Sequence, residues 1–496
     1  MAGSVLILLA VTLVQRTIGF GRGLLFCRWL DPLELGQWEL ALSFLLIAAP
    51  LVVVGLPGSF GRYVEHYRRR GQLRTFLYRT TVWTVLLSLL AVGTMLGAAP
   101  WFSLLVFGHR QGTALVMLMA LSLGPIVMHH FLMSLFAALR MFRIVAGMQF
   151  VQSLVFAVLG IVLLLTWRFS AASIVIAYGG ASLIASAWAI VLRMGRVLAD
   201  LPAPSGPLPH AHFWAKLLRF SVWVWVTNLL ANLFMVVDRY MIIHVSGLET
   251  SRALAEMGQY HSSRIVPLLL VSIAELFAAL LTPYLSRDCE AGRWQRVSAR
   301  LNLALKLVAL GMLVASVVIL SLARPLFDWV LNGKFAGGEA ILPWALAYCS
   351  LFGVAAVAQN YLWCAEKARL GSLALLAGLV SNVALNLVLL PRFGLMGAVL
   401  ATTAANMVAL VLGLRLNQAA GMTIDRGTWF LCTAPVVLGL GLWPALALLA
   451  GVALTLLTSD LLVSQSEKDQ LRAVAARYAP YVMRRRPQPT TLPVAE

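Results

Sequence analysis

Several apolar segments that are long enough to span a membrane contain ionisable residues. The stretch FMVVDRYMI, residues 234 to 242, places Asp238 and Arg239 side by side. The other embedded charges are Arg16, Arg22, Arg264, Glu275 and Lys306. A charge at mid-membrane costs at least about 2.5 kcal/mol, so each should face protein or water rather than lipid. Because arginine bonds phosphate oxygens in a bidentate manner, the four arginines among them predict recognition of a phosphate group.

Helical geometry places some of the embedded polar residues on common faces. At 100° per residue, Asn228, Asn232 and Arg239 lie within about 40° of one another, with Asp238 a step aside. On the next run His261, Arg264 and Glu275 also align, since eleven residues return a helix to within about 20°. Arg16 and Arg22 are about 120° apart and need not share a face. The stripes together predict one polar cavity.

Two other roles for these charges remain open. The arginines can pair with Asp238 and Glu275 and hold helices together, although the five embedded cations outnumber these two acids. Asp238 and Glu275 can instead bind a coupling proton or sodium ion, because a membrane carboxylate with a raised pKa can change its charge. The cysteines have no metal-ligand spacing, so we expect neither a metal nor another cofactor.

The elements that carry these residues are membrane-spanning helices. Hydrophobic residues make up 61% of the 496 and charged residues only 11%, which is typical of a polytopic membrane protein. About 20 apolar residues cross a bilayer as a helix. The predicted spans are 5–27, 36–60, 77–99, 114–138, 146–167, 171–193, 217–245, 260–285, 299–322, 340–363, 371–390 and 394–417, with two short ones in 428–463. We therefore predict an all-α fold of about 14 helices.

Proline and glycine divide the chain into two halves. The segment DLPAPSGPLPHAH cannot continue a helix and predicts a cytoplasmic linker over 200–214. It separates a six-helix lobe, 1–199, from a second, 215–420. Two additional short helices follow over 421–463, and then a basic tail over 464–496. Ser466 and Asp469 have capping-box spacing, which favours an interfacial helix in that tail.

The net charge of +19 follows membrane topology. With a cytoplasmic N-terminus, 26 of the 38 lysines and arginines fall in cytoplasmic loops and the tail, and seven fall in outer loops. The positive-inside rule then predicts that both termini are cytoplasmic, and nucleic acid is not needed to explain the basic composition. The first span carries two arginines and follows no basic region, so we expect it to remain in the mature protein.

The two halves repeat each other. LGQWELALSFLL at 35–46 matches MGQYHSSRIVPLLL at 257–270 with a shift of 222, pairing Gly36 with Gly258. The same shift carries Arg16 onto Asp238. At shifts of about 225, Pro100 falls on Pro325 and Arg140 near Glu366. Six-helix units in the same order predict parallel repeats about an axis along the membrane normal.

Two long motifs resemble a known family. The stretch RTIGFGRGLLFCRWLDPLELGQWELALSFLLIAAPLVVVGLPGSFGRYV resembles the opening helices of the polysaccharide-export flippases of the multidrug/oligosaccharidyl-lipid/polysaccharide (MOP) superfamily. AGLVSNVALNLVLLPRFGLMGAVLATTAAN, residues 377–406, is similar to their helices 11 and 12. The resemblance covers roughly residues 5–420 and implies a bacterial inner-membrane transporter.

The resemblance also implies a substrate and a site. Such proteins move lipid-linked oligosaccharides, usually carried on undecaprenyl diphosphate, from the inner to the outer leaflet through a cavity between two lobes. Related lipid II flippases carry cavity arginines in helices 1 and 8, which matches Arg16, Arg22 and Arg264. They usually have another in helix 2, and residues 36–60 contain none. Polysaccharide assembly proteins are the partners that the family implies.

Two other classes of protein are weighed against the flippase. A drug or cation antiporter of the same superfamily would share the fold, but a cationic substrate calls for acidic cavities. A membrane enzyme of polysaccharide assembly would place acids, histidines or a nucleotide-binding domain in sizeable loops. This chain has no P-loop and no outer loop beyond about 20 residues. The sequence therefore favours a transporter over an enzyme.

Overall fold

A computed structural model describes residues 2–195, 209–465, 467–469 and 472, and these form helices without a strand. The first half contains α1 (Ala2–Trp29), α2 (Pro32–Val52), α3 (Leu56–Arg69), α4 (Leu73–Gly97), α5 (Ala99–Phe107), α6 (Thr113–Ala138), α7 (Phe142–Thr166), α8 (Ala171–Ala189) and the π-helical turn η1 (Ile190–Met194). The second contains α10 (His210–Val245), α11 (Thr250–Glu290), α12 (Trp294–Ser321), α13 (Ala323–Pro325), the π-helical η2 (Leu326–Val330), α14 (Ala336–Ala358), α15 (Asn360–Cys364) and α16 (Ala368–Ala419). It is followed by α17 (Arg426–Thr433), the 3-10 helix η3 (Ala434–Leu440) and α18 (Leu442–Thr458).

The long helices correspond to the predicted spans. Ten described helices are long and apolar enough to cross a membrane. One of them, α16, covers both 371–390 and 394–417, joined across a kink at Gly394 with φ 55° and ψ −136°. The other nine each match one predicted span, and α1 covers the first. Two short helices were predicted after residue 427. The first corresponds to α17 together with η3, and the second corresponds to α18.

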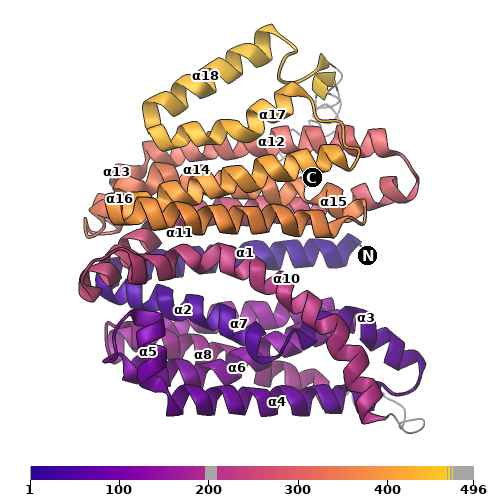
Figure 1. Cartoon of the computed structure of the whole chain (residues 1–496), viewed down its shortest axis with the longest axis vertical. Helices are drawn as coiled ribbons and strands as arrows, with labels where there is room; N and C mark the ends of the chain where they lie inside the picture. Colours follow the sequence, from indigo (N-terminus) through magenta and orange to yellow (C-terminus); the bar gives the residue numbers. More distant parts are fainter. Residues whose placement is uncertain (1, 196–208, 466, 470–471, 473–496) are drawn as a thin grey trace, which may run out of the picture.

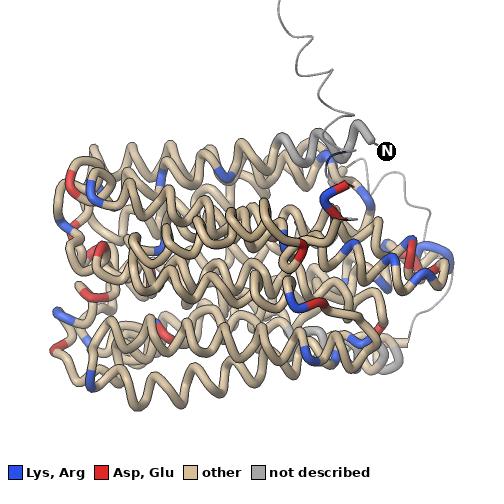
Figure 2. The backbone as a smooth tube through the Cα atoms, turned by 90° about the horizontal axis from the view of Figure 1, so that it is seen from above, with Lys and Arg blue, Asp and Glu red and all other residues tan. Residues whose placement is uncertain are grey.

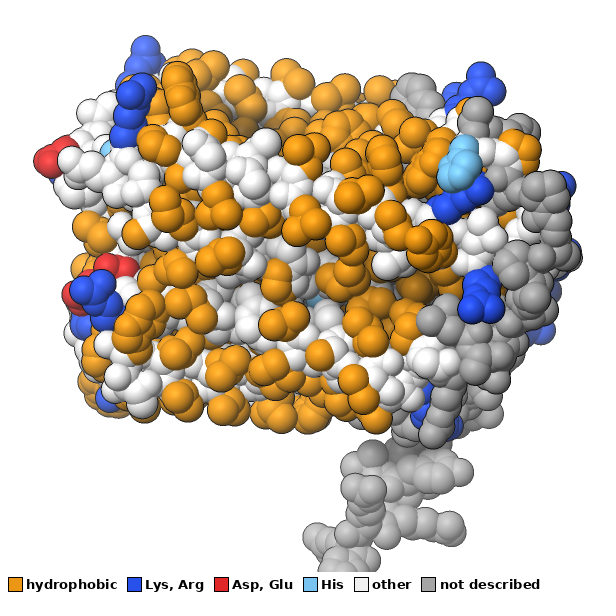
Figure 3. Space-filling model, turned by 90° about the horizontal axis from the view of Figure 1, so that it is seen from below, with side chains coloured by type: hydrophobic (Ala, Val, Ile, Leu, Met, Phe, Trp, Pro, Cys, Tyr) orange, Lys and Arg blue, Asp and Glu red, His pale blue; other side chains and the backbone are white. Residues whose placement is uncertain are grey.

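The two halves form two stacked groups of helices (Figure 1). Helices α2 to α8 lie in one group and α11 to α18 in the other, with α1 and α10 between them. Charged residues gather at the two ends of the long helices (Figure 2), and hydrophobic side chains cover the band between these ends (Figure 3). We call the end with the chain's N-terminus and α3 the basic end, and the end with α5 the opposite end.

Turns at equivalent places in the two halves have the same backbone. Gly71 and Gly292 both have positive φ, 65° and 69°, and each turn is closed by the same pair of backbone hydrogen bonds. Arg140 and Glu366 adopt the left-handed conformation, with φ of 61° and 56°, although neither is glycine. Their shifts of 221 and 226 residues agree with the repeat read from the sequence. The internal repeat therefore extends to local backbone geometry.

Helices α2 and α11 meet in a reciprocal contact near the opposite end. A Cβ on Gly36 would lie 1.9 Å from the carbonyl oxygen of Leu254, and a Cβ on Gly258 would lie 1.9 Å from that of Pro32. Pro32 and Leu254 are again 222 residues apart, so each half offers the same glycine and the same carbonyl to its counterpart. Such a self-complementary contact is expected where a two-fold axis passes between two equivalent elements.

The predicted boundaries need two corrections. Span 36–60 is not one helix, because Val54 and Gly55 take positive φ and separate α2 from α3. The predicted linker ends too late, since α10 already begins at His210. The rest of that linker, 200–208, lies outside the described residues. Phe213 at the start of α10 packs among aromatic residues of the first half, so tertiary packing extends this helix beyond its apolar run.

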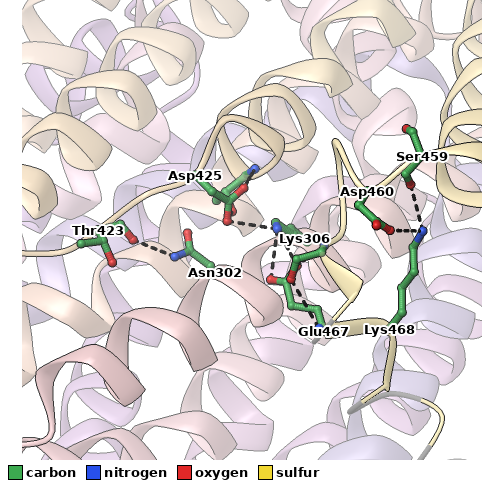
Figure 4. A network of polar contacts seen from close by, with 10 residues as sticks. Asn302, Lys306, Thr423, Asp425, Ser459, Asp460, Glu467 and Lys468 are labelled. Atoms are coloured by element: carbon green, nitrogen blue, oxygen red, sulfur yellow. Dashed lines mark hydrogen bonds and ion pairs between the residues drawn. The ribbon is translucent and has the colours of Figure 1, made fainter.

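A buried lysine fixes the C-terminal helices to α12 (Figure 4). The Lys306 side chain is 4% exposed and lies 3.0 Å from the Asp425 carboxylate and 2.8 Å from that of Glu467. Asp425 also caps α17 by accepting a hydrogen bond from the Thr428 backbone N–H. Because a buried charge is tolerated when it is paired, Lys306 belongs to this C-terminal contact.

A capping box stands at the start of the tail. It is formed by Ser464 and Glu467, whose side chains and backbone N–H groups bond reciprocally. The predicted cap Ser466 and most of the proposed interfacial helix, residues 473–496, lie outside the described residues. Glu467 therefore joins the first turn of the tail to α12.

Candidate functional site, a cationic cavity between the two halves

A cavity of about 450 Å³ lies between α1, α2, α7 and α8 of the first half and α11 of the second. Its basic lining residues are Arg16, Arg22 and His261, and no carboxylate is among the described residues that line it. Hydrogen-bonding side chains come from Gln15, Gln152, Ser153, Tyr178 and Ser272. The cavity therefore combines a positive charge with many donors, which suits an anionic, oxygen-rich ligand.

Arg22 is held by aromatic packing. Its guanidinium carbon lies 3.9 Å from the centroid of the Phe156 ring. Phe156 in turn contacts Trp38 and Tyr178. Arg22 forms no salt bridge with a carboxylate of the described residues. Stacking fixes the plane of the guanidinium but satisfies none of its N–H donors, so these remain available to a ligand.

Arg16 has a weak internal partner. Its guanidinium lies 3.7 Å from the carboxylate of Glu275 on α11, and about half of each side chain is exposed. An ion pair of this exposure contributes only about 0–1 kcal/mol. Glu275, one of the predicted coupling or charge-tuning residues, thus joins the two halves only loosely.

The other two predicted arginines meet a carboxylate that the sequence reasoning missed. Glu39 on α2 lies 2.9 Å from Arg239 and 3.5 Å from Arg264, and its other oxygen lies 2.5 Å from His261. Glu39, Arg239 and Arg264 are all buried. The repeat with its shift of 222 residues aligns Glu39 with His261. This alignment is the sequence signal that could have identified Glu39. Arg239 and Arg264 therefore lie outside the cavity wall in this conformation.

Asp238 is also buried, within the second half. It accepts a hydrogen bond from the Tyr260 hydroxyl and one from the backbone N–H of Arg239. It also lines a small cavity of about 30 Å³ together with Arg264 and Tyr348. Asp238 and Arg239 are thus tolerated in a membrane helix because protein dipoles and opposite charges surround them.

The predicted asparagines do not join the site. Asn228 on α10 is exposed and Asn232 is half-buried, and neither lines the cavity. Of the predicted residues, Arg16, Arg22 and His261 are brought together, with Glu275 beside Arg16. The described residues contain no group of three or more His, Cys, Asp or Glu side chains placed to hold a metal ion.

Solved structures with a similar fold are transporters. The lipid II flippase MurJ in an inward closed conformation has a TM-score of 0.69 and 16% sequence identity, covering 96% of this chain and 100% of that chain. A multidrug resistance MATE transporter of the MOP superfamily matches in its outward-facing conformation with a TM-score of 0.61 and 12% identity, covering 85% and 96%. An inward-facing structure of a multidrug resistance MATE family transporter also matches, with a TM-score of 0.57 and 14% identity, covering 84% of this chain and 99% of that chain.

Sequence comparison gives the family. No curated protein sequence matches this chain. The model of the family described as polysaccharide biosynthesis protein matches residues 1–289, more than half of the 496 residues. With the MOP-type transporter fold, this match shows that the chain is a multi-pass membrane protein of the polysaccharide biosynthesis family.

Proposed function

We propose that this protein flips a lipid-linked oligosaccharide, of the undecaprenyl-diphosphate type, from the inner to the outer leaflet for surface polysaccharide biosynthesis. The observation that supports this proposal is a cavity lined by Arg16 and Arg22 without a carboxylate. The two phosphates are the charged part of such a substrate, and they give up hydrating water when they enter the protein. Guanidinium groups replace that water with charge-assisted hydrogen bonds.

The same lining weighs against a cationic drug as the substrate. The MATE-like fold is compatible with a cation-coupled antiporter, which is the alternative function. A cationic drug in this cavity would face Arg16 and Arg22, and the neighbouring carboxylates of Glu275 and Glu39 are already paired with Arg16 and His261. The electrostatics of the cavity thus favour an anionic substrate.

The orientation follows from charge. We assign the basic end to the cytoplasm of a bacterial inner membrane, with both termini there. The halves touch at the opposite end through Gly36 and Gly258, and Lys334 lies 3.3 Å from Asp31 across the halves. In this assignment the outer end is closed, and alternating access requires these contacts to separate.

Orientation is tested by cysteine labelling in intact cells. A cysteine at Arg70, next to the exposed arginines of α3, should react with a membrane-impermeant maleimide only after the membrane is permeabilised. A cysteine at Glu249, in the loop before α11, should react without permeabilisation. The reverse pattern would overturn the charge-based orientation.

Flipping itself is tested in proteoliposomes. A fluorescent undecaprenyl-diphosphate oligosaccharide should become accessible to a membrane-impermeant quencher faster with protein than in protein-free vesicles. In parallel, a fluorescent cationic drug should show no protein-dependent movement. Movement of the drug and not of the glycolipid would replace the proposed function by the antiporter alternative.

Coupling is tested in the same vesicles. Asp238 and Glu275 are the proposed coupling residues, and the ion is a proton or sodium. An imposed gradient of the coupling ion should change the rate of flipping, and the response should be lost in Asp238→Asn. A rate that ignores both gradients would remove the coupling role.

A further inference from the structure

The contacts of Glu39 cross from one half of the molecule to the other. Glu39 and Ser43 lie on α2, and both contact Arg239 on α10. His261 and Arg264, which complete the cluster, lie on α11. We call Glu39, Arg239, His261 and Arg264 the interhalf charge cluster. It lies one to two helical turns below the Gly36 and Gly258 contact, and thus on the closed outer end of the cavity.

The cluster is adjacent to the cavity. His261 lines the cavity wall, and so does Trp38, the neighbour of Glu39 in sequence. On α11, Arg264 lies between His261 and Ile265, which both line the cavity, and Ile265 is next to Gly23, the neighbour of Arg22 in sequence. Arg264 itself is buried and does not line the cavity, so the cluster lies directly behind this part of the cavity wall.

Glu39 leaves the two arginines incompletely bonded. The Nε atoms of Arg239 and Arg264 are buried and have no hydrogen-bond partner. A carboxylate has two oxygens, and those of Glu39 are already shared among three basic side chains. A diphosphate offers more acceptor oxygens and more negative charge, so it can satisfy donors that Glu39 cannot.

We propose that Glu39 is an internal substitute for the substrate's phosphates, and that a diphosphate entering the cluster displaces it and thereby releases the outer end. This inference rests on the proposed function and assigns Arg239 and Arg264 to a second anion site, next to that of Arg16 and Arg22. Asp238 stays with the second half throughout, since its partners Tyr260 and Arg239 belong to that half. Opening is thus coupled to occupancy, because the lock breaks only when another anion takes its place.

The lock is tested by the distance between the halves at the outer end. Spin labels on cysteines at Arg110 and Arg324, both exposed and in different halves, report this distance in nanodiscs by pulsed electron paramagnetic resonance. The native cysteines are replaced beforehand. In Glu39→Gln the ratio of long to short distances should rise by about 5- to 150-fold over the parent protein. Glu34→Gln is the matched control, because Glu34 is on the same helix but binds the Ala171 N–H within the first half.

Displacement is tested with inorganic pyrophosphate as the probe. Pyrophosphate should raise the long-distance population of the parent protein and leave that of Glu39→Gln unchanged. If Glu39→Gln does not fold, Glu39→Gln with Arg264→Gln removes one charge of each sign and should show the same opening. A closed distance in the folded variants, or no response of the parent protein to pyrophosphate, would refute the proposal. These measurements contain no glycolipid, so a failure of flipping in proteoliposomes would overturn the proposed function separately.

Discussion

Replacing Arg22 by alanine should reduce flipping of a lipid-diphosphate oligosaccharide by at least tenfold while the protein remains folded. Hydrogen bonds to charged groups contribute about 1.5–3 kcal/mol each, and about 1.4 kcal/mol is a factor of ten in binding. Arg22 forms no salt bridge with described carboxylates and stacks on Phe156, so its removal breaks no internal ion pair. The initial flipping rate in proteoliposomes measures the effect.

The matched control for this change is Arg28→Ala. Arg28 is on the same helix, is exposed and does not line the cavity, so its loss should leave flipping near that of the parent protein. Size-exclusion chromatography of both variants monitors folding. Normal flipping by the surviving Arg22→Ala protein would mean that the arginine is only a structural residue.

Gly258→Ala should prevent the outer end from closing fully. The new Cβ would lie 1.9 Å from the Pro32 carbonyl oxygen, so α2 and α11 have to move apart. Overpacking typically costs about 1–3 kcal/mol, which corresponds to about a 5- to 150-fold shift between two conformations. The label pair at Arg110 and Arg324 should therefore show the longer distance without any ligand, and flipping should fall because one of the two end states is lost.

The repeat supplies a second version of this test. Gly36→Ala meets the Leu254 carbonyl oxygen at the same distance, so the two variants should behave alike. Gly61→Ala on α3, where nothing lies within 4 Å of the added Cβ, is the control. A closed distance in both Gly36→Ala and Gly258→Ala would show that closing of the outer end does not depend on the contact between α2 and α11.

The sequence by itself determined the helices, their order and the internal repeat. Apolar runs long enough for a bilayer have few alternatives to helix, because lipid offers no hydrogen-bond partners to the backbone. Two boundaries differ from the sequence prediction. The break at Val54 and Gly55 depends on a close approach to the Ser221 carbonyl oxygen on α10, 2.6 Å from a Cβ on Gly55, and hydropathy does not contain that contact.

Which charges share a site was decided by the tertiary structure. Helical periodicity gives the face of each charge on its own helix, and the cavity role of the arginines of α1 followed from the family resemblance. Periodicity does not show which helices meet. Arg239 and Arg264 were therefore grouped with Arg16 and Arg22, whereas packing of α2 against α11 brings Glu39 between them. The sequence likewise left Lys306 as an embedded cation without a partner, and the tertiary structure supplies Asp425 and Glu467, more than a hundred residues later.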